Sequence, residues 1–222
     1  MKQMRIFSLF LRSVACIGIT VLTGCAASEA TRYYSLQQPV NALAQSAGSS
    51  FSGQVPAYVI NVQPVSVPEQ VDRLQIVVTD PASTQVYPLE SYLWAAPLAQ
   101  EFRTALSAAL QAQLNTLDID LTQLPEGRPA WKVLLQVQRF ESIYDTHVAL
   151  EVAWALEPLN QPAQISHLCG ARVILPVKNG VSALVAGHRE ALIRVAQVIA
   201  RHLQAQGHAF NPVDGVEIVS CS

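Results

Sequence analysis

The stretch that decides the fold reads HVALEVAWALE, from His147 to Glu157. Its large apolar side chains stand at every second position, as Val148, Leu150, Val152, Trp154 and Leu156. The positions between them hold alanine, histidine and glutamate. Because successive side chains of a strand point to opposite faces of a sheet, this alternation predicts a strand with one buried face and one open face.

The segments on either side of this strand predict the other elements. Strands are expected over residues 32–36, 57–67, 74–79, 84–87, 131–140 and 164–177, and helices over 95–115 and 182–206. Strands and helices come in blocks along the chain, which is typical of α+β domains. We expect a mostly antiparallel sheet with two amphipathic helices packed on one face. The other face is expected to be open to solvent or to a partner.

Both expected helices carry an apolar stripe with a spacing of three and four residues. In the first helix, Pro97 suits the opening turn, and Arg103, Ser107 and Gln111 are expected to face outward. In the second helix, His188 falls on the apolar stripe. We therefore interpret His188 as a core histidine.

The N-terminus has the parts of a secretory signal peptide. Lys2 and Arg5 precede an apolar run that Arg12 interrupts, which leaves the run shorter than the roughly 20 apolar residues of a membrane span. The run ends in Leu-Thr-Gly-Cys, with the cysteine at Cys25. This ending resembles the lipobox of bacterial lipoproteins. A plain signal peptide with an incidental cysteine is the alternative.

The lipobox resemblance implies a lipid-anchored protein. Residues 1–24 would be removed as a lipoprotein signal peptide, and Cys25 would carry covalent diacylglycerol and an N-acyl group. Two or more acyl chains give stable membrane anchoring. Residues 25–32 would then be a short membrane tether, and residues 33–222 a single periplasmic α+β domain with a flexible polar loop at about 37–56.

The residues after the cysteine imply where the protein is anchored. Ala26 stands where an aspartate would signal retention at the inner membrane, so the resemblance implies the outer membrane, with the domain on its periplasmic face. Tyr33 lies eight positions after Cys25. A fully extended tether of that length spans at most about 28 Å, which would hold the domain close to the membrane.

Two cysteines, Cys169 and Cys221, belong to the expected domain. In an oxidising compartment they could form a disulfide, which would contribute on the order of 4 kcal/mol through loop closure. Two free thiols are the alternative. No metal site is expected, because the histidines are scattered and the six-residue spacing of His202 and His208 suits a metal poorly.

The sequence offers no recognisable catalytic machinery. It has no nucleophile elbow, no zinc-protease motif and no glycine-rich phosphate loop, so we do not expect an enzyme or a bound cofactor. His147, Glu151 and Glu157 share a polar strand face that we interpret as solvated, and Asp118 and Asp120 are expected to be exposed. The net charge of -2 and the absence of a basic run argue against nucleic-acid binding.

Several short motifs resemble one known family in their order and spacing. They are YYSL at 33–36, VQPVSVPE at 62–69, DRLQIV at 72–77 and WAAPL at 94–98. Together with the lipobox they resemble the PqiC (YmbA-type) family of ABC-type transport auxiliary lipoproteins over about residues 25–206.

This resemblance implies a non-catalytic role in lipid transport across the envelope. The expected partner is a periplasmic tunnel protein with MCE domains, and the lipoprotein would be a ring-like homo-oligomer that docks the tunnel at the outer membrane. The candidate interface or core residues are Tyr33, Tyr34, Asp72, Arg73, Tyr92, Trp94 and Pro97. Two alternatives are a lipoprotein that activates or scaffolds a wall-synthesis or secretion complex, and a carrier that holds lipid in its own cavity.

Overall fold

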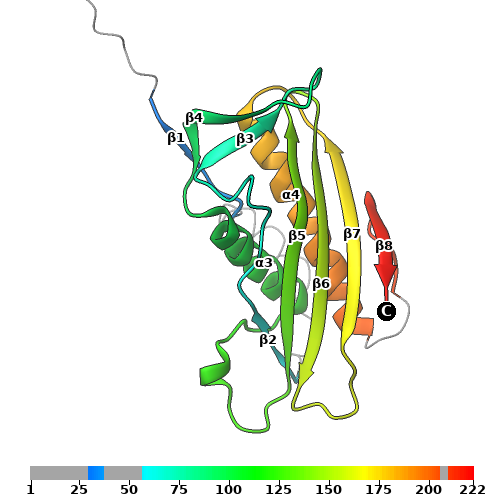
Figure 1. Ribbon diagram of the computed structural model, residues 1–222. Helices are drawn as coiled ribbons and strands as arrows, with labels where there is room; N and C mark the ends of the chain where they lie inside the picture. The colour runs from blue at the N-terminus through cyan, green and yellow to red at the C-terminus, as the bar shows by residue number, and fades with distance from the viewer. Residues whose placement is uncertain (1–29, 38–56, 206–209) are drawn as a thin grey trace, which may run out of the picture. The chain divides into compact units, whose positions relative to one another are not determined.

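In the computed structural model, one eight-stranded sheet carries two helices on one of its faces (Figure 1). The structure describes residues 30–37, 57–205 and 210–222. The helices are α3 (Leu98–Leu114) and α4 (Val181–Ala205). The predicted α+β fold is therefore confirmed. The predicted signal peptide, the lipidation at Cys25 and most of the predicted loop at 37–56 lie outside the described residues.

The strands follow the order β1-β4-β3-β5-β6-β7-β8, and β2 pairs with β5. Their bounds are β1 (Arg32–Tyr34), β2 (Val59–Val62), β3 (Gln75–Thr79), β4 (Val86–Trp94), β5 (Ala130–Ile143), β6 (His147–Leu159), β7 (His167–Pro176) and β8 (Val216–Cys221). The pairs β3–β4, β5–β6, β6–β7 and β7–β8 are antiparallel. The pairs β1–β4, β2–β5 and β3–β5 are parallel.

The alternation that predicted β6 is present in the structure. Val148, Leu150, Val152, Trp154 and Leu156 are all buried, and they face the helices. In Figure 1, α4 crosses behind β5, β6 and β7, and α3 lies next to α4. Burying a side chain of this size contributes about 1.5–3 kcal/mol, so this helix–sheet contact is a large source of stability.

A glycine allows α4 to approach the sheet closely. A Cβ atom at Gly187 would lie 2.5 Å from Cγ1 of Val177 and 3.0 Å from Cγ2 of Val148. Real Cβ contacts are longer than this, so a larger residue would push the helix away from β6. The close fit follows from the dense packing of protein interiors.

Two expectations about polar residues were wrong. The side chain of Asp118, expected to be exposed, is only 4% exposed. Its carboxylate accepts hydrogen bonds from Val62 N at 2.9 Å, Ser107 Oγ at 2.6 Å and Arg103 Nη2 at 3.2 Å. Ser107, expected to face outward, is buried. These three donors replace the hydrogen bonds to water that the carboxylate loses on burial. Asp118 thereby joins α3 to β2.

Two strands differ from their sequence patterns. β2 covers only Val59–Val62 of the strand predicted over 57–67, and all four of its residues are buried, because β2 lies between β5 and a backbone bridge from Ile60 to Asp118. The strand β8 was not predicted at all. It is the last strand of the sheet, and the predicted disulfide between Cys169 and Cys221 joins it to β7.

His188 is a core histidine, as interpreted. It is 2% exposed, its Nε2 lies 2.8 Å from Ser142 Oγ, and its ring stacks on Phe140 with centroids 3.8 Å apart. Burial lowers the pKa of His188 to about 3, because the charged imidazolium would lose its hydration. The histidine is therefore neutral in the folded protein at neutral pH.

This burial predicts a specific loss of stability in acid. Below pH 6.5 the unfolded chain takes up a proton at His188 while the folded chain does not, until the pH approaches 3. The free energy of unfolding should therefore fall by about 1.4 kcal/mol per pH unit across this range on account of His188. Urea unfolding from pH 7 to pH 4 measures the slope. His188→Gln should remove this component, whereas the control His147→Gln should keep it; equal slopes in the wild type and His188→Gln would contradict the prediction.

Candidate functional site

The first candidate surface surrounds β1, the described strand nearest in sequence to Cys25. β1 pairs in parallel with the end of β4, with Arg32 opposite Tyr92 and Tyr34 opposite Trp94. Tyr34 stacks on Tyr92 with ring centroids 6.2 Å apart, and the guanidinium carbon of Arg32 lies 5.6 Å from the centre of the Tyr92 ring. Tyr33 is 68% exposed. An exposed tyrosine beside a stacked pair and an arginine is typical of contact surfaces.

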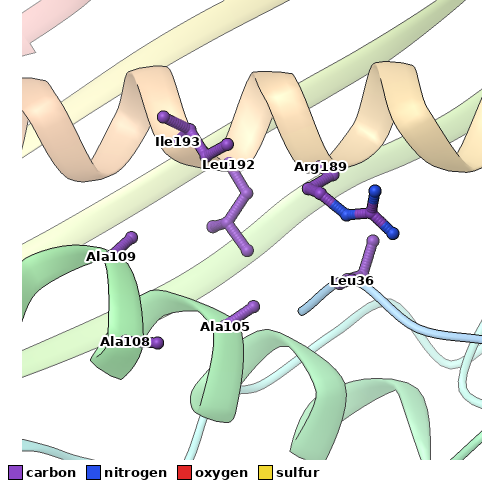
Figure 2. Close-up of a pocket in the computed structure, with 7 residues that line it drawn as sticks. All are labelled: Leu36, Ala105, Ala108, Ala109, Arg189, Leu192 and Ile193. Carbon is purple, nitrogen blue, oxygen red and sulfur yellow. The ribbon is translucent and has the colours of Figure 1, made fainter. Parts of the chain in front are cut away.

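Directly after β1, Leu36 inserts between the two helices. It is 1% exposed. Figure 2 shows it beside a small cavity lined by Ala105, Ala108, Ala109, Arg189, Leu192 and Ile193. The alanines of α3 leave room for the leucine, so side chains of α3 and α4 enclose it together. The cavity that remains is about 20 Å³, which is room for about one water molecule.

Polar contacts fix the same segment. The Glu101 carboxylate is buried and accepts hydrogen bonds from Ser35 Oγ at 2.7 Å and from Leu36 N at 2.9 Å. Arg189 Nη2 donates to the Ser35 carbonyl at 2.8 Å. Hydrogen bonds to a charged group are worth about 1.5–3 kcal/mol. We call Ser35, Leu36, Glu101 and Arg189 the anchor clamp, because they join the segment that leads back to Cys25 to both helices.

The structure gives different environments to the other predicted site residues. Trp94 is 2% exposed and packs against Phe140, so it is part of the core. Pro97 is exposed at the N-terminus of α3, and its carbonyl accepts hydrogen bonds from two backbone N–H groups of the first turn. Asp72 and Arg73 are exposed in the turn before β3, and no ion pair joins them within the described part of the chain.

The second candidate surface is the face of the sheet that the helices leave open. Charged side chains form a network across β5 to β8, centred on Glu151. Its carboxylate accepts hydrogen bonds from Arg172 at 2.8 Å and Arg139 at 3.4 Å, and Arg172 also pairs with Glu217 at 3.5 Å. The hydrogen bond from Arg172 is the main reason why the pKa of Glu151 lies below its usual value.

Apolar residues are exposed next to these charges. Leu168, Ile174 and Val219 are each more than half exposed, and the alternation of β7 places Leu168 and Ile174 on the same face as Arg172. We call Leu168, Arg172, Ile174, Glu217 and Val219 the open-face patch. Its mixture of apolar and paired charged groups suits contact with another protein.

The structure also brings together a cluster that the sequence analysis did not expect. His202, near the end of α4, lies beside the disulfide, with Nδ1 3.6 Å from Cys169 Sγ. The ring of His167 lies 4.7 Å from that of His202, centroid to centroid. Spacing along the chain could not indicate this group, because its members come from α4, β7 and β8.

Comparisons with known proteins agree with this architecture. A family model described as "ABC-type transport auxiliary lipoprotein component" matches residues 34–200. A crystal structure titled only as an uncharacterized protein aligns with a TM-score of 0.56 and 22% identity, over 79% of this chain and 99% of the other. A protein from Xanthomonas campestris aligns with a TM-score of 0.52 and 18% identity, over 71% and 90%. These two likenesses show a shared fold.

None of the proteins with curated descriptions matches the sequence. Within the described residues, neither helix is both long enough and apolar enough to cross a membrane.

The anchor clamp predicts a large effect of one substitution. Leu36→Ala should lower the free energy of unfolding by about 2–5 kcal/mol, because it removes buried apolar contacts and leaves a cavity between the helices. Tyr33→Ala, three positions away on the exposed surface, should change it by less than about 0.5 kcal/mol. Urea unfolding of both variants provides the comparison. Similar small changes in both would mean that the segment is not fixed to the helices.

Proposed function

The chain belongs to the family of ABC-type transport auxiliary lipoprotein components, and from this premise we propose that it is the non-catalytic docking subunit of an MCE-type (Pqi-like) intermembrane lipid transport system. In this proposal it is anchored through Cys25 to the periplasmic face of the outer membrane and supports envelope integrity. The observation that carries the proposal is the family match over residues 34–200, which includes β2 to β7 and most of α4.

The anchor clamp supports a role that depends on position close to a membrane. Arg32, the first residue of β1, lies seven positions after Cys25, so an extended tether would span at most about 25 Å. Leu36 and the Glu101 carboxylate then fix the chain to the helices. A lipid on Cys25 would therefore hold the whole sheet near the bilayer, with Tyr33 on the side nearest the tether.

The packing between the helices leaves no room for a lipid between α3 and α4. The cavity between α3 and α4 is about 20 Å³, which holds about one water molecule and no acyl chain. In this proposal the domain contributes to transport through its surface. The open-face patch, and the strands β1 and β8 at the two ends of the sheet order, are the surfaces that we assign to self-association into a ring and to contact with the MCE-domain tunnel.

Crosslinking in cells tests the proposed partner. A photo-reactive phenylalanine analogue would replace Ile174 in the open-face patch, or Tyr33 beside the tether, and Gln113, exposed on α3, as the control. We expect Ile174 and Tyr33 to give self-crosslinks and crosslinks to an MCE-domain protein, identified by mass spectrometry, and Gln113 to give few.

Other outcomes of the same experiment would overturn the proposal. Capture of a wall synthase or a secretion component, with no MCE-domain protein, would favour the alternative of an envelope assembly lipoprotein. An absence of self-crosslinks, together with stoichiometric lipid found by mass spectrometry in the purified monomer, would favour the alternative of a lipid carrier.

The anchor itself can be tested with a matched pair of cysteine variants. Cys25→Ser should block lipidation and release the protein from the outer-membrane fraction, because the acyl chains provide the anchoring energy. Cys16→Ser should change nothing, because residue 16 belongs to the segment that we expect to be removed. Fractionation and intact-mass measurement distinguish the two. Retention of Cys25→Ser in the outer membrane would contradict the anchor.

A further inference from the structure

Three groups that bind metals converge at the edge of the sheet where β8 joins β7. They are the sulfur atoms of Cys169 and Cys221 and a ring nitrogen of His202, and these atoms all lie within 4.8 Å of one another. Cys169 comes from β7, Cys221 from the end of β8 and His202 from the end of α4, which Figure 1 shows behind β7. In the structure the two sulfurs form a disulfide.

The backbone holds the two cysteines together independently of the sulfur–sulfur bond. Leu168 and Ser222 exchange two hydrogen bonds, from Leu168 N at 3.0 Å and from Ser222 N at 2.9 Å. Cys169 and Cys221 are the next pair along the ladder, so they occupy a non-hydrogen-bonded position, where opposite side chains are closest. The ion pair between Arg172 and Glu217 holds the same two strands nearby. The two thiols would therefore stay adjacent after reduction.

The third group already stands at a suitable distance. Zn–S and Zn–N bonds of about 2.3 and 2.05 Å at a tetrahedral angle place sulfur and nitrogen about 3.6 Å apart. The distance from Cys169 Sγ to His202 Nδ1 is 3.6 Å. Two thiolates on the same metal ion would lie about 3.8 Å apart, a separation that the sulfurs can reach once the bond between them is broken.

The surroundings keep the ring of His202 oriented. Its side chain is buried, and the ring of Phe210 stacks on it with centroids 5.1 Å apart. A neutral imidazole with one nitrogen directed at the sulfurs is the form that binds a metal.

We propose that Cys169, Cys221 and His202 form a binding site for one thiophilic divalent ion of the zinc type when the disulfide is reduced. Two thiolate sulfurs and His202 Nδ1 supply three ligands, and water supplies the fourth. The disulfide and the metal are thus alternative states of the same three residues. This inference does not depend on the proposed function.

The disulfide form is converted into the metal-bound form in two steps, a thiol–disulfide exchange and then metal binding. A dithiol reductant donates two electrons and two protons, so that the S–S bond breaks, two thiols form on Cys169 and Cys221, and the reductant becomes a disulfide. Binding of Zn²⁺ then displaces one proton from each thiol. A small disulfide reverses the reaction: it takes up two electrons and two protons and becomes a dithiol, while the bond between Cys169 and Cys221 forms again and the ion is released.

Cobalt spectroscopy tests the site, because Co²⁺ substitutes for Zn²⁺ and reports thiolate ligands directly. The full-length mature protein in detergent is reduced, freed of reductant without oxygen and titrated with Co²⁺. We expect a near-ultraviolet thiolate-to-cobalt band and visible bands of a tetrahedral site that saturate at one ion per chain. Zn²⁺ should abolish these bands. The untreated disulfide form should show none.

Matched variants assign the ligands. His202→Gln should weaken binding at least about tenfold, and Cys221→Ser, at an exposed position in the last strand, should remove most of the thiolate band. His147→Gln should bind as the wild type does. Circular dichroism checks that each variant is folded. The proposal is overturned if the reduced wild type shows no thiolate band, or if folded Cys221→Ser binds as tightly as the wild type.

Discussion

The packing of α4 against the inner face of β6 is the contact on which the rest of the structure depends. Five alternate apolar residues of β6 are buried beneath α4. The absence of a side chain at Gly187 allows the helix to lie this close to the sheet. Because α3 packs beside α4 on the same face, both helices are used on one side of the sheet. The opposite face then has no covering element among the described residues, and this is where the charged network and the exposed apolar residues of β7 and β8 lie. The same contact thus creates the core and leaves a surface for partners.

The anchor clamp extends this logic to the N-terminal side of the domain. The Leu36 side chain packs between the two helices. The buried Glu101 carboxylate accepts its hydrogen bonds from the same segment, at Ser35 and Leu36. A lipid anchor acting on a loosely attached segment would leave the orientation of the domain free. In the proposed role, an anchor that continues into a strand and a buried leucine would restrict it. Restricted orientation would be valuable to a subunit that meets a partner extending from another membrane.

Periodicity was sufficient to predict most of this architecture, because β6, the helices and the inner face of β5 are determined by which residues face the core. The buried carboxylate of Asp118 could not be predicted in this way, since its donors come from β2 and α3. The strand β8 was missed because its six residues are mostly exposed and pair only with β7. Tyr33 and Trp94 are both aromatic residues of the short motifs, but Tyr33 is exposed in β1, whereas Trp94 at the end of β4 packs against Phe140 in the core. In each case the deciding contact joins segments that are distant in sequence.

The two ends of the described chain are attached to the sheet in two different ways. Strands at the edges of a sheet expose unpaired backbone groups and invite unwanted pairing, and here β1 and β8 stand at the two ends of the strand order. β1 is held by the anchor clamp and β8 by a disulfide. The first attachment does not depend on the redox state, because it consists of buried packing and hydrogen bonds. The second depends on the redox state, and a metal ion bound by the same cysteines and His202 would hold the last residues of β8 against β7 when the disulfide is open. Under that arrangement β8 remains attached to β7 in both redox states, and the open-face patch, which includes residues of both strands, keeps its shape.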